Sequence, residues 1–311
     1  MNACFLGVDC TPVRLEDRTQ LEGRLARNPQ RLSGYTFASL AAWNETFRYG
    51  WCQPDPDTLF VSCTIDPDRN RHLLQPIGVF PSPLQEQIVR KALLLPYPLR
   101  VVGVAAGFLE SCPEFVRHFE VVEDPGNANY LYSTEELATL AGRKFSPKRN
   151  LIAQAERAYA WTREEVRGAN AAECAALVRQ IRAEAESRPP PSLLQDMLAI
   201  DFTLRHLEQL GLHGYLLRVE GKAVAFCLWE PMAPGVAVIH FERALRSYKG
   251  LYQVLNREAA RALLAHGFTH VNREEDLGDP GLRQAKLSYN PVEIVMAYSL
   301  TLRRSSDRGS S

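Results

Sequence analysis

The order of helices and strands predicted for the second half of the chain constrains the fold most strongly. Residues 215–219 and 223–229 are rich in β-forming side chains and flank Glu220-Gly221-Lys222, a connection typical of a β-hairpin. Periodic apolar positions predict helices on either side of these strands. The predicted order begins with two helices (169–186 and 193–210) and three antiparallel strands (215–219, 223–229 and 236–242). A helix (251–266), a strand (268–271), a helix around Leu282 to Leu287 and a last strand (292–302) follow.

The first half repeats the later part of that order. Residues up to about 30 are polar and weakly periodic, which predicts a short strand or arm. Next come a predicted helix (36–47), two strands (58–65 and 73–80), a helix (83–95), a strand (100–104), a helix (112–118) and an extended ribbon (119–132). The sequence therefore predicts an α+β chain with an N-terminal domain (1–132), a basic connecting helical segment (133–164), a C-terminal domain (165–303) and a disordered tail (304–311).

This element order resembles that of the Gcn5-related N-acyltransferase (GNAT) fold. The resemblance implies two tandem GNAT-like (acyl-CoA N-acyltransferase-like) domains, each a mixed, mostly antiparallel sheet flanked by helices. Enzymes of that fold bind the pyrophosphate of coenzyme A through a Gln/Arg-x-x-Gly-x-Gly/Ala loop at a helix N-terminus. The corresponding segment here is Ser247-Tyr248-Lys249-Gly250-Leu251-Tyr252, in which only Gly250 fits the pattern. The bulky Tyr252 at the last small position argues against ordinary coenzyme A binding.

Composition limits the classes of protein that fit. The 36 basic and 36 acidic residues give a formal net charge of zero, which argues against a general nucleic-acid coat protein but leaves room for a local basic patch. The seven cysteines are scattered without a Cys-x-x-Cys pair, which predicts reduced thiols and a cytoplasmic protein. The longest apolar stretch, residues 93–109, is interrupted by Pro96, Pro98 and Arg100, so we expect no membrane span. We also expect no metal site, because Gly267 interrupts the single His-x-x-x-His spacing, His266 to His270.

Residues 271–291 concentrate unusual polar chemistry directly after the predicted buried strand 268–271. Polar groups at the end of a buried strand are where α/β folds commonly place ligands. The alternative is an acidic helix entry, since carboxylates favour the positive end of a helix. The combination of Asn272, Lys286 and Tyr289 favours a site.

Four basic residues surround Phe145 in the connecting segment, namely Arg143, Lys144, Lys148 and Arg149, and Asn150 follows them. Charge runs are commonly solvated linkers, and that reading stays open. The other reading is a contact to phosphate or to an RNA backbone, for which a basic stripe is the expected footprint.

Several longer motifs resemble those of an uncharacterised bacterial family (DUF2156-like) related to the C-terminal domain of phosphatidylglycerol lysyltransferases. The likeness runs from about Ser33 to Leu302. The motifs that carry it are Tyr130-Leu131-Tyr132-Ser133-Thr134, Gly142-Arg143-Lys144, Lys148-Arg149-Asn150, Tyr248-Lys249-Gly250-Leu251-Tyr252-Gln253, Asn272-Arg273-Glu274-Glu275-Asp276-Leu277-Gly278 and Ser288-Tyr289.

The resemblance implies an aminoacyltransferase that moves an aminoacyl group from charged tRNA to an amine or hydroxyl acceptor. The sequence has no counterpart of the large membrane-spanning half of the lysyltransferases, which argues against a phospholipid and leaves the acceptor, small molecule or lipid, open. In this hypothesis Glu242 or Asp276 is the base or the amine-binding carboxylate, and Tyr289 is a donor. The expected substrate-binding residues are Tyr248, Gly250, Tyr252, Gln253, Asn256, Asn272, Arg273, Glu274 and Lys286. The expected tRNA or phosphate contacts are Lys144, Lys148, Arg149 and Asn150.

Three further points stay open at the level of sequence. His240 could act as a general base, yet its alternation with Ile239 and Phe241 on a strand fits a structural histidine equally well. An N-acyltransferase that uses acetyl-CoA or another acyl-CoA is an alternative, with Gly250 near the phosphates. A non-catalytic ligand-binding module of the same fold is another, because fold does not decide function. We expect the cleft in the second half, and the oligomeric state stays open.

Overall fold

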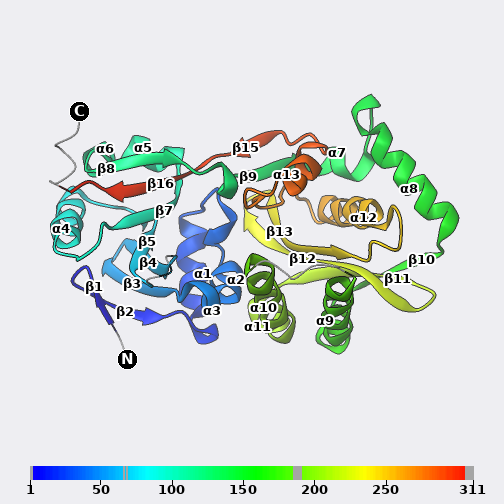
Figure 1. The fold of residues 1–311 in the computed structure, drawn as a ribbon, viewed down its shortest axis with the longest axis horizontal. Helices are drawn as coiled ribbons and strands as arrows, with labels where there is room; N and C mark the ends of the chain where they lie inside the picture. The colour runs from blue at the N-terminus through cyan, green and yellow to red at the C-terminus, as the bar shows by residue number, and fades with distance from the viewer. Residues whose placement is uncertain (1–2, 66, 68, 185–190, 305–311) are drawn as a thin grey trace. The chain divides into compact units, whose positions relative to one another are not determined.

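The computed structural model describes residues 3–65, 67, 69–184 and 191–304. The described residues form two compact units, each built on its own sheet (Figure 1). One unit contains the residues up to Asn129 and those from Val295 onward, and the other is Tyr130–Ile294. The predicted disordered tail lies outside the described residues, except for Arg304.

The first unit is a mixed sheet with helices packed against it. Strands β5 and β7 pair in parallel, whereas the neighbouring pairs β4–β5 and β7–β16 are antiparallel. The strands in spatial order are β1 (Ala3–Phe5), β2 (Val8–Pro12), β3 (Gly50–Asp55), β4 (Thr58–Thr64), β5 (Arg71–Leu74), β7 (Arg100–Ala105), β16 (Ala297–Leu302) and β8 (Phe119–Glu123), with β6 (Ile77–Gly78) against β4. The helices are α1 (Arg18–Arg27), α2 (Phe37–Ala42), α3 (Asn44–Phe47), α4 (Ser82–Leu93), α5 (Ala106–Ser111) and α6 (Pro113–Val116).

The first residues of this unit are more ordered than their sequence pattern predicts. Two strands, β1 and β2, agree with the expected extended arm, but α1 follows them as a ten-residue helix. Only Leu21 and Leu25 of α1 are buried, one helical turn apart. Two apolar contacts in an otherwise polar helix leave a periodic signal too weak to read from the sequence.

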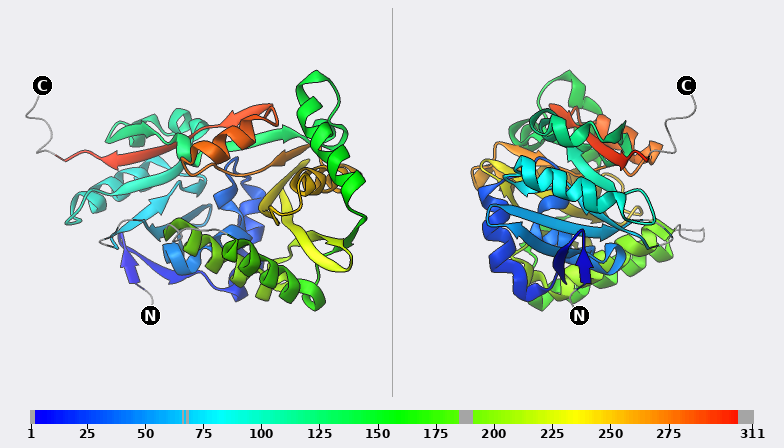
Figure 2. Two further views of the ribbon diagram at one scale, coloured as in Figure 1. Left: turned by 45° about the vertical axis from the view of Figure 1, so that its right-hand side comes forward. Right: turned by 90° about the vertical axis from the view of Figure 1, so that its left-hand side faces the viewer.

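The second unit also has a mixed sheet, in which β13 and β14 pair in parallel and β14 and β9 pair antiparallel. Its strands in spatial order are β10 (Trp161–Glu165), β11 (His213–Val219), β12 (Lys222–Ala233), β13 (Val236–Ala244), β14 (His270–Asn272), β9 (Asn129–Ser133) and β15 (Glu293–Val295). Its helices are α7 (Thr134–Thr139), α8 (Ser146–Ala158), α9 (Gly168–Ala183), α10 (Pro191–Arg205), α11 (Leu207–Leu210), α12 (Leu251–Ala265) and α13 (Pro280–Leu287). Helix α12 covers one face of this sheet, and α9 and α10 lie on the other (Figures 1 and 2).

Local signals in the second unit are confirmed. Val219 pairs with Lys222 across the β11–β12 turn, in which Glu220 and Gly221 have positive φ angles of 49° and 78°. The Ser133 hydroxyl accepts a 3.3 Å hydrogen bond from the Glu136 amide and so caps the start of α7. Gly267 follows α12 with a φ of 85°, the left-handed conformation that favours glycine after a helix.

The predicted last strand, residues 292–302, is divided between the two sheets. Strand β15 belongs to the second sheet, whereas β16 lies between β7 and β8 in the first. The predicted ribbon 119–132 is divided in the same way, into β8 and β9. Leu300 and Leu302 are 0% and 2% exposed within the hydrophobic core of the first unit, and this burial holds β16 there.

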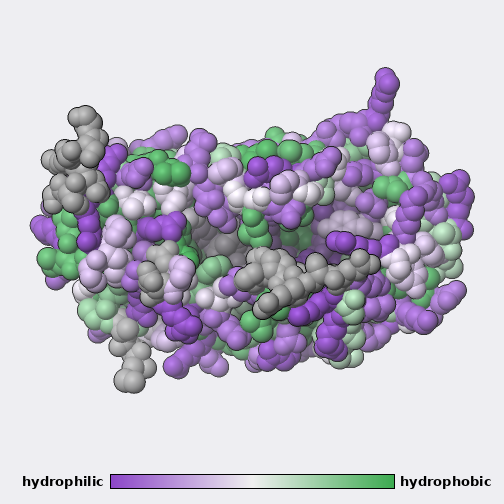
Figure 3. Space-filling model, in the orientation of Figure 1, coloured by the Kyte–Doolittle hydropathy of each residue, from purple (hydrophilic) through white to green (hydrophobic). Residues whose placement is uncertain are grey.

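Among the described helices, none combines the length and the apolar character that a membrane crossing requires. On the face shown in Figure 3, hydrophilic and hydrophobic residues alternate in small patches.

Candidate functional site

A buried ion pair stands where β13 and β14 of the second unit end. Val238 of β13 pairs with Asn272 of β14 in parallel, and the next residue of that chain is Arg273. The Arg273 guanidinium donates from Nε and Nη2 to one oxygen of Glu242, at 3.0 and 2.5 Å. Both side chains are at most 7% exposed. Burial opposes the charge of Arg273, yet the Glu242 carboxylate holds the pKa of Arg273 above its ordinary value.

The first turns of α12 supply two more contacts to Glu242. Asn256 donates from Nδ2 to Oε1 at 3.1 Å, and the Tyr252 hydroxyl donates to Oε2 at 3.4 Å. These two residues are four apart on one helix and therefore share a face. The carboxylate of Glu242 is thus held on both oxygens.

Two tyrosine rings lie next to the Arg273 guanidinium. Its central carbon is 5.6 Å from the ring centroid of Tyr132 and 5.0 Å from that of Tyr289, within the range of cation–π contacts. Lys148 of α8 places its ammonium 4.2 Å from the Tyr289 centroid and donates to the Ser288 hydroxyl at 2.7 Å. We call Glu242, Arg273, Tyr252, Asn256, Tyr132 and Tyr289 the Glu242 cluster.

The Glu242 cluster contains polar atoms that have no partner within the described part of the chain. They are Arg273 Nη1, the Tyr289 hydroxyl and Asn256 Oδ1, and all three are buried. Buried polar groups are nearly always hydrogen-bonded in native proteins, and leaving one unsatisfied costs about 1–3 kcal/mol. Three such atoms in one cluster indicate a place where a polar ligand group, or water, completes the hydrogen bonds.

Lys286 of α13 is buried beside the same loop. Its ammonium donates to the backbone carbonyls of Arg273 and Glu274, and its exposed fraction is 9%. Burial, together with the charge of Arg273, lowers the pKa of Lys286 to about 8. A neutral amine donating to two carbonyls keeps its lone pair free, so Lys286 can accept a proton near neutral pH.

His240 is a structural cation rather than a free base. Its two ring nitrogens lie 2.8 Å from Glu230 Oε1 and 2.7 Å from Glu274 Oε1. Burial would lower the pKa of His240, but the two carboxylates outweigh it and raise the pKa to about 10. The contact holds Glu274, whose φ of 59° is left-handed, and the Asn272 side chain accepts a 2.7 Å bond from the Glu274 amide.

Asp276 is fully engaged by its own loop. Its oxygens accept from Arg283 Nε at 2.7 Å and Nη2 at 3.0 Å, from the Tyr130 hydroxyl at 2.5 Å and from the Gly278 amide at 2.8 Å. The side chain is completely buried. Burial alone would raise the pKa of Asp276, but these hydrogen bonds hold it below its ordinary value. Glu242 and Asp276 were the two carboxylates predicted from the sequence as the base or the amine-binding group. Glu242 lies in the cluster, whereas Asp276 stabilises the loop before α13.

The basic residues expected to contact phosphate do not share one direction. Lys144 pairs with Glu136 at 2.8 Å, and Arg149 donates to the carbonyls of Leu140 and Gly142 at 2.5 and 2.6 Å. Asn150 is exposed. Lys148, in contrast, points to Tyr289 and the Glu242 cluster.

Gly250 packs against α8. Its φ is 84°, and a Cβ at this position would lie 2.2 Å from the carbonyl oxygen of Leu151. Tyr248, two residues earlier, has its ring 5.2 Å from that of Tyr159, and Gln253 is half-buried. The helix N-terminus that a coenzyme A pyrophosphate would need is therefore in contact with α8.

One member of the cluster was absent from the site residues expected from sequence. Tyr132 alternates with Tyr130 on β9, and both occur in the Tyr130-Leu131-Tyr132 motif. That alternation puts both rings on the same side of the strand, where they meet Arg273 and Lys286. The period-two spacing was the signal that could have identified Tyr132.

A family model described as "Phosphatidylglycerol lysyltransferase, C-terminal" matches residues 26–301. The chain belongs to this family. The match includes every residue of the Glu242 cluster, together with Lys148 and Lys286. No protein with curated function matches the sequence.

Solved structures similar to this lysyltransferase-family chain share its fold. A conserved protein of unknown function from Bacteroides thetaiotaomicron VPI-5482 is 27% identical with a TM-score of 0.87, covering 95% of this chain and 100% of that chain. L-PGS from Bacillus licheniformis is 16% identical (TM-score 0.67; 95% and 94% covered), and a tandem GNAT protein from the clavulanic acid biosynthesis pathway is 10% identical (TM-score 0.52; 96% and 99% covered). The predicted α+β fold of two tandem GNAT-like domains is confirmed.

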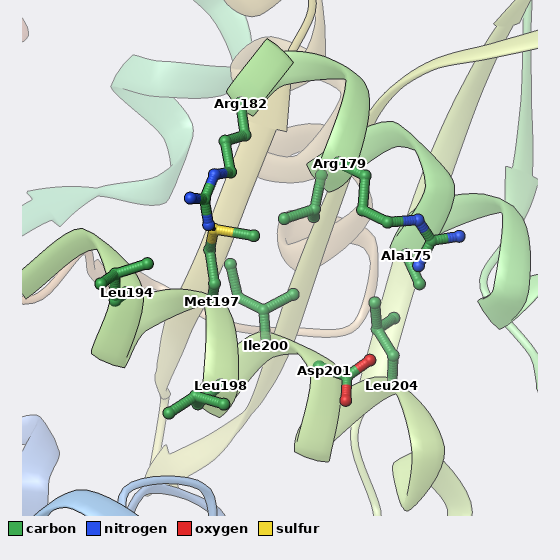
Figure 4. A pocket seen from close by; sticks show the side chains of 10 residues that line it. Ala175, Arg179, Arg182, Leu194, Met197, Leu198, Ile200, Asp201 and Leu204 are labelled. Carbon is green, nitrogen blue, oxygen red and sulfur yellow. The ribbon is translucent and has the colours of Figure 1, made fainter. Parts of the chain in front are cut away.

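One cavity of the second unit lies away from the Glu242 cluster. It is about 470 Å³ in volume and opens between α9 and α10 (Figure 4). Leucine, methionine, isoleucine, valine and alanine side chains form most of its lining, and its one carboxylate, Asp201, pairs with Arg205 at 2.9 Å. Among the described residues, no group of three or more His, Cys, Asp and Glu side chains is placed to hold a metal ion.

Proposed function

We propose that the protein transfers an aminoacyl group from charged tRNA to an amine or hydroxyl acceptor at the Glu242 cluster. The observation that carries this proposal is the set of three unpartnered buried atoms. Arg273 Nη1 donates, Asn256 Oδ1 accepts, and the Tyr289 hydroxyl can do either. An α-amino carbonyl unit supplies the matching groups, a carbonyl oxygen to accept and an amine to donate.

The reaction needs few protein groups. The acceptor nitrogen or oxygen attacks the ester carbonyl, which becomes an oxyanion, and the ester bond to the terminal ribose oxygen of tRNA then breaks. The acceptor loses one proton and the ribose oxygen gains one, so neither an oxidant nor a net proton is consumed. Donors aimed at the developing oxyanion are the groups that accelerate such a transfer most.

The residues divide these roles according to their charge. Arg273 Nη1 and the Tyr289 hydroxyl are our candidates for the oxyanion donors. Glu242, which is paired with Arg273, is our candidate to hold the α-amino group rather than to remove a proton. Lys286, whose pKa is about 8, is our candidate to take the acceptor's proton and return it to the ribose oxygen.

The contact between Gly250 and α8 favours a tRNA donor over an acyl-CoA. A coenzyme A pyrophosphate would have to occupy the helix N-terminus against which α8 packs. An aminoacyl ester at the end of tRNA makes no such demand.

The test is retention and deacylation of labelled aminoacyl-tRNA by the purified protein, with deacylated tRNA and acetyl-CoA as separate competitors. We expect retention that deacylated tRNA reduces and acetyl-CoA leaves unchanged. Tyr289→Phe removes a hydroxyl that has no partner among the described residues, so the fold should persist while the deacylation rate falls about 10²–10³-fold. Tyr298→Phe, in the first unit, is the matched control and should retain the wild-type rate.

Two results would contradict the proposal. Absence of retention, or retention displaced by acetyl-CoA, would exclude the tRNA donor. Equal rates for wild type and Tyr289→Phe would remove the cluster from the chemistry, and retention without any deacylation would favour a binding module.

A further inference from the structure

Each carboxylate around the Glu242 cluster lies beside a cation of the second unit, although Glu230 and Glu274 share one cation. Glu242 pairs with Arg273, Glu230 and Glu274 share His240, and Asp276 binds Arg283. Lys286 is buried near the remaining carboxylate, Glu275, whose charge partly offsets the effect of burial on the lysine. A positively charged substrate side chain would therefore find each of these carboxylates already beside a cation.

Lys148 is the exception among the cations. Its ammonium has a neutral partner, the Ser288 hydroxyl at 2.7 Å, and forms no ion pair with any described residue. It is half-buried and lies close enough to Arg273 for that charge to lower its pKa, after burial itself. Of these two neighbouring cations, only Arg273 is paired with a carboxylate, so the charge of Lys148 has no carboxylate partner among the described residues at this edge of the cluster.

The position of Lys148 relates it to the proposed aminoacyl site. Its ammonium lies 4.2 Å from the Tyr289 ring centroid, and the hydroxyl of that ring is one of the unpartnered atoms. The positive charge therefore lies about the length of one phenol ring from the atom that would meet the aminoacyl carbonyl. The side chain of a short acidic amino acid spans a comparable distance.

We infer that the aminoacyl group carries a carboxylate side chain, of the aspartyl or glutamyl class, and that Lys148 binds this carboxylate. The inference rests on the proposed function. It differs from the lysyl group in the family's description, since an ammonium would be repelled by Lys148 and Arg273. Lys148 is then a specificity-determining residue rather than a contact to tRNA phosphate.

The test uses amino acid α-amides, which present the α-amino carbonyl unit without an α-carboxylate. Dissociation constants of the α-amides of L-aspartate, L-glutamate, L-glutamine and L-lysine are measured by calorimetry at pH 7 with the full chain. We expect the better of the two acidic amides to bind at least about tenfold more tightly than the glutamine amide, and the lysine amide to bind most weakly.

Two variants of Lys148 and one control assign the effect. Lys148→Met should abolish the preference for the acidic amide over the glutamine amide, and Lys148→Glu should reverse it in favour of the lysine amide. Lys144→Met removes a more exposed lysine of the same segment, one that pairs with Glu136, and should preserve the wild-type preference. Circular dichroism of each variant confirms that the fold is retained.

The outcomes separate the inference from the proposed function. If the four amides bind equally, if the lysine amide binds best, or if Lys148→Met preserves the preference, the inference is wrong and the aminoacyl site stands. If inorganic phosphate binds to wild type but not to Lys148→Met, while that variant keeps the preference for the acidic amides, Lys148 is a phosphate contact and the inference is wrong. If no amide binds, the aminoacyl site itself fails, and the inference fails with it.

Discussion

Burial has opposite outcomes for the two nitrogen bases that flank the Glu242 cluster. His240 is buried between two carboxylates, and its pKa rises to about 10. Lys286 is buried against backbone carbonyls and near Arg273, and its pKa falls to about 8. The difference follows from their neighbours, because fixed negative charge stabilises a cation that burial would otherwise neutralise. His240 is therefore charged at pH 7, and Lys286 is the group that can exchange a proton.

The role of Lys286 predicts a pH dependence of aminoacyl transfer. A base must be deprotonated to act, so the rate should rise with pH and reach half its maximum near 8. Lys286→Gln should remove this rise and lower the plateau about 10²–10⁴-fold, the usual contribution of a general base. The measurement is single-turnover deacylation of bound aminoacyl-tRNA between pH 6 and 9, corrected for spontaneous ester hydrolysis. A variant that keeps the wild-type pH profile would exclude Lys286 as the base.

The role of His240 predicts a pH dependence of stability. Because its folded pKa of about 10 exceeds the ordinary value of 6.5, its contribution is fully present below pH 6.5 and is lost as the pH rises through 10. His240→Gln should therefore lower the free energy of unfolding by more at pH 6.5 than at pH 10. Urea denaturation of both proteins at the two pH values measures this difference. Comparing variant with wild type cancels the opposite trend from Lys286, and an equal loss at both pH values would contradict the shift.

At the scale of elements, the start of α12 joins the site to its support. Tyr252 and Asn256 on its first turns bind Glu242, while Gly250 before it packs against α8. Lys148 belongs to α8, so the same packing carries the lysine to Tyr289. The contact between Gly250 and α8 thus helps to position two side chains of the Glu242 cluster and the proposed specificity residue, Lys148.

A comparison of two glycines with nearly equal φ angles measures the energetic cost of crowding between residue 250 and α8. Gly250 and Gly267 have φ angles of 84° and 85°, but a Cβ at 267 would meet no atom within 4 Å. Both substitutions to alanine should cost roughly 1–2 kcal/mol for the left-handed backbone. Gly250→Ala should cost a further 1–3 kcal/mol or so, because the methyl group must displace α8. Chemical denaturation compares them, and equal losses would contradict the packing of α8 against this turn.

At the scale of the whole molecule, sequence neighbours belong to different sheets. Strand β15 belongs to the second sheet and β16 to the first, although only Met296 separates them. Strand β8 of the first sheet is followed by β9 of the second. The first unit is therefore completed by β16, a strand outside its main run of residues, whereas the second unit is one continuous stretch of chain. The stability of the first unit is thereby linked to the last residues described.

Leu300 tests this link. It is completely buried in the core of the first unit, so Leu300→Ala should cost about 2–5 kcal/mol. Hydrogen exchange followed by mass spectrometry should show faster exchange in β7 and β8, the partners of β16, and little change in β12 and β13. Ile294→Ala, at a residue that is 40% exposed, is the control and should change neither. Faster exchange confined to the second unit would contradict the assignment of β16.

The sequence by itself determined the family, the fold class and the local structure of most elements. The turn at Glu220 and Gly221, the cap at Ser133 and the glycine after α12 depend on residues a few positions apart, so short-range preferences suffice to predict them. Tertiary structure decided which strand joins which sheet, which carboxylate lies in the Glu242 cluster and where Lys148 points. Tyr130 and Asp276 are 146 residues apart in the chain, yet they form a hydrogen bond. This bond helps to hold Asp276 within its own loop, whereas Glu242 lies in the cluster. Such pairings depend on burial and on charges brought together only by folding, and no local pattern records them.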